Sequence, residues 1–222
     1  MINEPARREV AATARLMVQK GLARGTSGNI SARIGQDLFA VTPTGTDHLS
    51  LGPEDIVVLD STGCVVEGAL RPTSEVPMHL ATYRLRPDVA AIVHTHSEYA
   101  TTFAVLGEGI EAVHYLLAHA GPRVPCAPYA TYGTPELAAN AVATLGRGGA
   151  VLLANHGVLA VGRSLAAALT VAEAVETVAG LAYRARLLGR PNVLSDEEMA
   201  RVADAFRTYG QPARAQDRAG VG

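Results

Sequence analysis

The stretch Asn29–Thr42, NISARIGQDLFAVT, decides the fold class. Two largely apolar runs flank the turn Gly35-Gln36, which is the pattern of two strands joined as a hairpin. A second pair of runs flanks Ser61-Thr62-Gly63 in the same way. Hairpin-paired strands are antiparallel, whereas parallel neighbours need long crossover connections. The sequence therefore predicts a mixed, mostly antiparallel sheet and argues against a doubly wound parallel one.

Segments with helical periodicity or caps alternate with these strands, which predicts an α/β domain whose central sheet is flanked by helices. Neither a repeat nor a linker divides the chain, so we expect one domain over residues 1–210 and a flexible tail over residues 211–222, rich in Gly, Ala and Arg. The predicted helices are 4–23, 75–85, Ser97 to Gly107, 134–145, a long helix capped by Ser164 and one capped by Ser195 that runs towards Tyr209. The predicted strands are 29–34, 37–42, 56–60, 64–67, 90–95, 112–117, 150–154 and 158–161.

Composition excludes several classes of protein. The 222 residues carry a formal charge of −2 and are 48% hydrophobic, which excludes a disordered polymer and argues against binding nucleic acid or membrane through bulk charge. Lys20 is the single lysine, so catalysis through a lysine Schiff base is improbable. Cys64 and Cys126 match neither a metal-binding spacing nor a disulfide framework. With no apolar signal segment at the start, we expect a cytoplasmic protein that acts on a small molecule.

Three histidines have the setting of metal ligands. His94 and His96 end an apolar strand and are two residues apart, so they point to the same face and can reach one ion. His156 follows another apolar strand, where Gly157 permits a tight turn. Three imidazoles with an open position are typical of a catalytic zinc site, although two loop histidines at a strand end remain the alternative for the first pair. His79 lies four residues after Glu75 and is expected to line the same pocket.

Glu75 and three turns rich in small residues complete the candidate site. Glu75 begins a helix, where it is either an acid that complements the helix dipole or a carboxylate beside the metal, as ligand or general base. The turns Gly25–Asn29, Thr42–Thr46 and Thr73-Ser74 can cradle a phosphate with hydroxyls and backbone N–H groups. Their glycine spacing matches neither a Walker nor a dinucleotide motif, and each on its own is also an ordinary structural turn.

The order of these motifs resembles that of the zinc-dependent class II sugar-phosphate aldolase and epimerase family, over residues 5 to 210. The resemblance rests on Gly25-Thr26-x-Gly28-Asn29-x-Ser31, Thr42-Pro43-Thr44-Gly45, Pro72-Thr73-Ser74-Glu75, His94-x-His96 and His156-Gly157. It extends to Ala112-Val113-His114-Tyr115, Pro125–Thr134 and Phe206–Gly210. The family usually has two serines before the glutamate, and Thr73-Ser74 keeps both hydroxyls.

The resemblance implies a reversible retro-aldol cleavage of a ketose 1-phosphate, such as L-fuculose 1-phosphate, to dihydroxyacetone phosphate and a short aldehyde such as L-lactaldehyde. It implies one zinc per subunit, with cobalt or manganese as substitutes, and proton transfer by Glu75. It also implies a homotetramer with sites at subunit interfaces, where Tyr115 and Tyr209 act on the aldehyde half and Tyr209 reaches a neighbouring subunit. The implied zinc ligands are His94, His96 and His156. The implied phosphate site is Thr26, Gly28, Asn29, Thr44, Gly45, Thr73 and Ser74.

Three other functions are alternatives to an aldolase. A pentulose 5-phosphate epimerase of the family resembles it with an aspartate at the position of Glu75, so the glutamate favours an aldolase. A methylthioribulose 1-phosphate dehydratase can share the histidines and the glutamate, and the contexts of Tyr115 and Tyr209 favour an aldolase over it. A cytoskeletal adaptor domain has the same fold but has lost the zinc ligands, which are present here.

Overall fold

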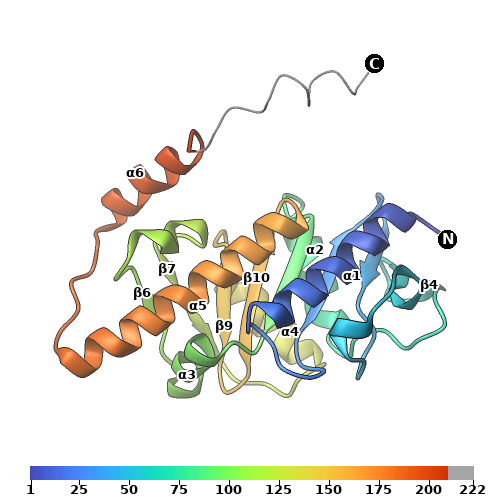
Figure 1. The fold of residues 1–222 in the computed structure, drawn as a ribbon, viewed down its shortest axis with the longest axis horizontal. Helices are drawn as coiled ribbons and strands as arrows, with labels where there is room; N and C mark the ends of the chain where they lie inside the picture. The colour runs from blue at the N-terminus through green and yellow to red at the C-terminus, as the bar shows by residue number, and fades with distance from the viewer. Residues whose placement is uncertain (210–222) are drawn as a thin grey trace.

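The computed structural model describes residues 1–209 and is built around an eight-stranded sheet (Figure 1). The strand order is β4-β3-β2-β1-β5-β10-β9-β8, and every neighbouring pair is antiparallel except β8 with β9. The sheet is therefore mixed and mostly antiparallel, as the hairpin pattern predicts. The strands are β1 (Asn29–Arg33), β2 (Leu38–Val41), β3 (Val57–Asp60), β4 (Val65–Glu67), β5 (Ala91–Thr95), β8 (Cys126–Ala127), β9 (Ala150–Leu153) and β10 (Gly157–Gly162); the short strands β6 (Ile110–Glu111) and β7 (Arg123–Val124) pair separately.

Helices cover both faces of the sheet, which gives three layers. In Figure 1, α1 and α5 cross the near face of the sheet, while α2 and α4 lie on the far face. The α-helices of the described chain are α1 (Glu4–Gln19), α2 (Val76–Leu85), α3 (Glu98–Leu106), α4 (Pro135–Leu145), α5 (Leu165–Leu188) and α6 (Asp196–Phe206), with short 3-10 turns at His48–Ser50, Pro53–Asp55 and Tyr115–His119. The expectation of one α/β domain with a helix-flanked sheet agrees with this arrangement, and the predicted tail 211–222 lies outside the described residues.

Alternation along the strands sends each side chain to one of two cores. In β5, Val93 joins the core under α1, α3 and α5, whereas Ile92 joins the core under α2 and α4. His94 is on the same face as Ile92, because side chains two residues apart on a strand share a face. β1 pairs with β5 in the register Asn29 opposite His94, and Ser31 on the same strand contacts α2. The α2 face of the sheet therefore receives the polar residues of the candidate site.

Capping chemistry accounts for several helix boundaries. The Thr134 hydroxyl accepts a hydrogen bond from the N–H of Leu137, and Ser164 and Ser195 cap the last two helices in the same way. Gly107 ends α3 with a left-handed φ of 68°, as expected for a helix C-terminus. Ser97 precedes α3, but its side chain makes no capping hydrogen bond. The predicted first helix ends at Gln19, earlier than expected.

The predicted strand 112–117 is wrong. Ala112 follows the two-residue strand β6, and Tyr115–His119 forms a 3-10 turn. The side chain of His114 accepts a hydrogen bond from the N–H of Leu116 and so caps this turn. A local side-chain cap therefore outweighs the apolar run, which is too short to distinguish a strand from a helical turn.

α5 is the one helix of residues 1–209 with the length and hydropathy of a membrane span. Its Val171, Val175 and Val178 are buried in the core beneath it, and the helix packs on β5 and β10. The apolar face of α5 is thus used within the fold, as in the core helix of a globular domain.

Candidate active site

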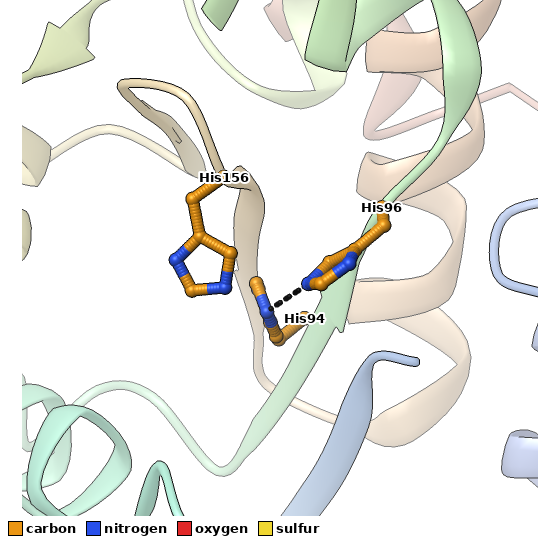
Figure 2. Close-up of side chains that lie close together, drawn as sticks. All are labelled: His94, His96 and His156. Carbon is orange, nitrogen blue, oxygen red and sulfur yellow. Dashed lines mark hydrogen bonds between the residues drawn. The ribbon is translucent and has the colours of Figure 1, made fainter. Parts of the chain in front are cut away.

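Three imidazoles meet where β5 ends beside the turn between β9 and β10 (Figure 2). The ring centroids of His94, His96 and His156 lie 4.8 to 5.0 Å apart, and their nearest ring nitrogens all lie within 4.8 Å of one another. Gly157 must be glycine because a Cβ there would overlap the carbonyl oxygen of Thr95 on the neighbouring strand. The turn itself is made by Asn155 at a left-handed φ of 55°. The predicted trio of histidines is therefore brought together.

The hydrogen bonds of His94 leave its other ring nitrogen suited to a metal ion. Nδ1 donates to the carbonyl oxygen of Val158 at 2.8 Å, so in the neutral ring Nε2 carries a lone pair. That atom lies 3.0 Å from Nε2 of His96 and 2.9 Å from Oε2 of Glu75. Lone pairs and a carboxylate that converge at such distances are stabilised by a cation between them. The donor set therefore fits a divalent metal held by imidazoles.

Electrostatics at the trio favour the same occupant. Burial, reinforced by His94, lowers the pKa of His96 to about 3 and that of His156 to about 4, which keeps both rings in the neutral form that binds metal. Burial disfavours a charge on His94, but Glu75 outweighs it and raises the pKa of His94. A positive charge is therefore stabilised at this point, close to the carboxylate.

Glu75 lies at the floor of the site, at the residue before α2, and is 5% exposed. Asn29 donates its side-chain N–H to Oε2 at 2.9 Å, whereas Oε1 lies 3.5 Å from Nε2 of His156 and makes no hydrogen bond within residues 1–209. Burial favours the protonated carboxyl, but the charge and hydrogen bond of His94 outweigh it and lower the pKa of Glu75. The carboxylate is ionised and has one oxygen anchored and one free.

A cleft of about 330 Å³ opens above this floor. All seven residues predicted to bind phosphate line it, together with Glu75, His96 and His156. His48 supports one wall, since its Nε2 lies 3.1 Å from the carbonyl oxygens of both Ser27 and Gly28. The hydroxyl of Thr73 accepts the N–H of Glu75 at 3.2 Å, which ties the phosphate turn to the start of α2.

Other predicted residues lie elsewhere. His79 does not line the cleft: it is 1% exposed and lies behind Asn29, whose Oδ1 is 2.6 Å from its Nε2. Tyr115 and Tyr209 are 48% and 87% exposed and lie outside the cleft of a single chain. Lys20 pairs with Glu173 at 3.0 Å on the surface and is absent from the cleft lining. It therefore does not lie where it could form a Schiff base with a substrate in the cleft.

Sequence reasoning missed several lining residues. Tyr129 and Tyr132 line the cleft and are 60% and 66% exposed, and Asn155 lines it beside His156. The two tyrosines belong to the segment Pro125–Thr134, which carries part of the family resemblance without an assigned role. Their place in this segment is the signal that could have found them, because a tyrosine offers a ligand both a ring face and a hydroxyl.

Comparison with known proteins gives the family. Residues 8–183 match the family described as Class II Aldolase and Adducin N-terminal domain, and the chain belongs to it. The chain is an enzyme of the class II aldolase family, since its named relatives are aldolases, and its three histidines could hold a metal ion.

Named relatives cover nearly the whole chain. The 5-deoxy-D-ribulose 1-phosphate aldolase of Bacillus thuringiensis is 45% identical over 95% of this chain and all of the relative. The L-fuculose phosphate aldolase of Escherichia coli is 42% identical over 91% of this chain and 94% of the relative. A solved structure of an L-fuculose 1-phosphate aldolase superposes with a TM-score of 0.88 at 44% identity, over 91% of this chain and 96% of that one.

Proposed function

We propose that this enzyme cleaves a ketose 1-phosphate to dihydroxyacetone phosphate and a short aldehyde, reversibly and with a divalent metal. The observation that carries the proposal is the meeting of three imidazoles and an ionised Glu75 at the floor of a cleft walled by hydroxyls and backbone N–H groups. The hydroxyls and N–H groups that line the cleft can bind a phosphate. The three histidines and Glu75 can serve a carbanion, which needs a cation to stabilise it and a group to carry its proton.

His94, His96 and His156 would hold the metal, for which we propose zinc, with cobalt or manganese as functional substitutes. When bound, the metal supplies Lewis acidity that stabilises the negative charge developing on the ketone oxygen. Lys20 cannot supply the alternative electron sink, because it lies on the surface in an ion pair and outside the cleft.

The phosphate is held without lysine. Gly28 and Gly45 adopt left-handed φ angles of 75° and 66° in two turns that line the cleft. Successive N–H groups in such turns form a concave anion site. Further donors around it are the hydroxyls of Thr26, Thr44, Thr73 and Ser74 and the amide of Asn29. The negative charge of the phosphate is therefore stabilised by many neutral donors rather than by one cationic side chain.

Glu75 handles the proton at carbon. Cleavage breaks the C3–C4 bond of the ketose, leaves its electron pair on C3 and releases a proton from the C4 hydroxyl. Glu75, ionised in the free enzyme, takes up a proton in place of the one that the C4 hydroxyl releases and gives it to C3, which yields dihydroxyacetone phosphate; in synthesis it removes the proton from C3. A residue in this role contributes about 10²–10⁴-fold in rate.

Tyr115 and Tyr209 are proposed to act on the C4 hydroxyl and the aldehyde half. Their exposure and their absence from the cleft lining of their own chain support a contribution from a neighbouring copy, and we propose a homotetramer as the assembly. We also propose that the enzyme is cytoplasmic.

The named relatives differ in the aldehyde half of their substrates. The named relatives act on L-fuculose phosphate and on 5-deoxyribulose 1-phosphate, which share C1 to C3 and differ beyond C4. Cleavage of the first gives L-lactaldehyde, and cleavage of the second gives acetaldehyde. We propose a ketose 1-phosphate with a short, uncharged tail as the substrate class.

A panel of ketose 1-phosphates and pentulose 5-phosphates, with dihydroxyacetone phosphate release as the readout, tests the proposal. We expect release from L-fuculose 1-phosphate or 5-deoxyribulose 1-phosphate, loss of release with a chelator and recovery with zinc. Conversion of a pentulose 5-phosphate to its epimer without release would instead identify an epimerase, and loss of water from methylthioribulose 1-phosphate a dehydratase. Lys20→Met is the matched control and should retain full activity, and inactivity of this folded variant would refute the metal mechanism.

A further inference from the structure

Five buried polar side chains form a continuous chain that ends at Glu75. The hydroxyl of Tyr83 lies 2.8 Å from Oγ of Ser31, which lies 2.6 Å from Nδ1 of His79. Nε2 of His79 lies 2.6 Å from Oδ1 of Asn29, whose Nδ2 lies 2.9 Å from Oε2 of Glu75. None of the five is more than 6% exposed. His79 and Tyr83 belong to α2, and Asn29 and Ser31 belong to β1. The hydrogen-bonded side chains therefore connect the helix to the sheet.

The direction of every hydrogen bond follows from the Asn29 amide. Its NH₂ group donates to Oε2 of Glu75, so its oxygen faces His79 as an acceptor. The facing nitrogen of His79, Nε2, must then carry the proton. Burial lowers the pKa of His79 to about 3, so the ring is neutral and its Nδ1 is an acceptor. Ser31 consequently donates to Nδ1, and Tyr83 donates to Ser31.

The opposite arrangement is unfavourable at each link. A His79 ring protonated on Nδ1 would present a lone pair to Asn29 and attract the NH₂ group. Asn29 would then place its oxygen against Oε2 of Glu75, where two acceptors repel each other. The Asn29 oxygen therefore favours the tautomer with the proton on Nε2, and the Ser31 hydroxyl, which can turn its proton to Nδ1, satisfies the lone pair that this tautomer leaves there. The second N–H of the Asn29 amide stays available to a ligand in the cleft that Asn29 lines.

We propose that Ser31 and His79 are positioning residues for the proton transfer by Glu75. Through Asn29 they hold Oε2 of the carboxylate as a hydrogen-bond acceptor and leave Oε1, which has no hydrogen-bond partner in the described part of the chain, as the atom that carries the proton. This role rests on the proposed function, since it concerns the proton exchanged with C3. Apolar side chains of similar size could fill the space of Ser31 and His79. The presence of polar, hydrogen-bonded side chains there argues for a role beyond packing.

Variants at His79 and Ser31 test the role by separating proton transfer from binding. His79→Leu and Ser31→Ala should retain bound metal and should change the KM for the ketose 1-phosphate far less than kcat. They should lower both kcat and the exchange of the α-hydrogen of dihydroxyacetone phosphate with D₂O by about 10–100-fold, the usual effect of losing an outer partner of a site. His79→Gln can present an N–H near the position of Nε2 and should recover part of the loss.

Thr82→Ala is the matched control. Thr82 is a buried polar residue of α2 whose hydroxyl donates to the carbonyl oxygen of Met78 at 2.8 Å, within the same helix. The control should lose stability without loss of exchange. If His79→Leu does not fold, Ser31→Ala decides the question, because it removes a single atom.

Nitrogen NMR of the enzyme labelled at histidine provides a readout independent of turnover. His79 should show the tautomer protonated on Nε2, and Ser31→Ala should shift the resonance of Nδ1, because that nitrogen loses its hydrogen-bond donor. Wild-type exchange rates in folded His79→Leu and Ser31→Ala, beside an active wild type, would overturn the positioning role and leave the proposed function intact. A wild-type protein that neither cleaves ketose 1-phosphates nor exchanges the α-hydrogen would refute both.

Discussion

A methyl group added at Gly28 should damage both the fold and the metal site. Gly28 has a φ of 75°, and a Cβ there would lie 2.7 Å from the carbonyl oxygen of His94, about 0.7 Å closer than ordinary contact allows. The left-handed backbone costs alanine about 1–2 kcal/mol relative to glycine. Overpacking against the backbone of β5 costs about 1–3 kcal/mol more. Gly28→Ala should therefore lose about 2–5 kcal/mol of the free energy of unfolding.

Gly21→Ala is the matched control. Gly21 has nearly the same φ, 74°, but a Cβ there meets no atom within 4 Å. It should therefore lose only the backbone contribution of about 1–2 kcal/mol. At about 2–4 °C per kcal/mol for a chain of this size, Tm should fall by about 2–8 °C in Gly21→Ala and by about 4–20 °C in Gly28→Ala.

The two variants should also differ in catalysis. Relief of the contact moves β5 at His94, and a 1 Å displacement in an active site can cost about 10²-fold in rate. We expect Gly28→Ala to lose at least about tenfold in kcat and to bind metal more weakly, while Gly21→Ala keeps wild-type kinetics. Thermal unfolding by circular dichroism, metal titration and cleavage rates measure these quantities. Equal losses of Tm and equal kcat in the two variants would refute the close approach of Gly28 to β5.

Four further changes probe separate parts of the site. His94→Ala should lose bound metal and activity together, and metal analysis that finds one ion per chain would contradict its role as a ligand. Glu75→Gln should keep the metal but lose about 10²–10⁴-fold in turnover and in α-hydrogen exchange, measured by NMR in D₂O; exchange at the wild-type rate would mean that another group carries the proton. Ser74→Ala should raise KM for phosphorylated substrates in steady-state assays, and an unchanged KM would remove its hydroxyl from the phosphate site. Tyr209→Phe should retain exchange while losing carbon–carbon cleavage, and loss of both activities would argue against a role confined to the aldehyde half.

The sheet and the metal trio could be predicted because their signals are local. Gly35-Gln36 between two apolar runs is enough to indicate a hairpin, and His94 and His96 share a face through the two-residue period of a strand. The same reasoning fails where an element is too short to have a period. β6, β7 and β8 have two residues each, and the run 112–117 was misassigned for that reason.

The hydrogen-bond chain behind the site could not be predicted. His79 and Asn29 are 50 positions apart, and Ser31 and Tyr83 are 52 positions apart. Their contact depends on how α2 lies on β1, which no local pattern encodes. The helical spacing of His79 from Glu75 suggested a shared pocket, yet the hydrogen bond with Asn29 holds the ring beneath the floor of the cleft.

The place of β5 in the sheet ties assembly of the site to the order in which the chain folds. His94 pairs with Asn29 from the first strand and with Leu159 from the last strand of the sheet along the chain, and its Nδ1 bonds across 64 positions to Val158. Contacts of such long range form slowly, because the loops between them must close first. During synthesis, the trio is incomplete until His156 has been made and β10 has paired with β5. A metal ion that binds only the finished trio stabilises that state by mass action, so a chain with a misplaced β5 loses both its activity and the stabilisation that the ion provides.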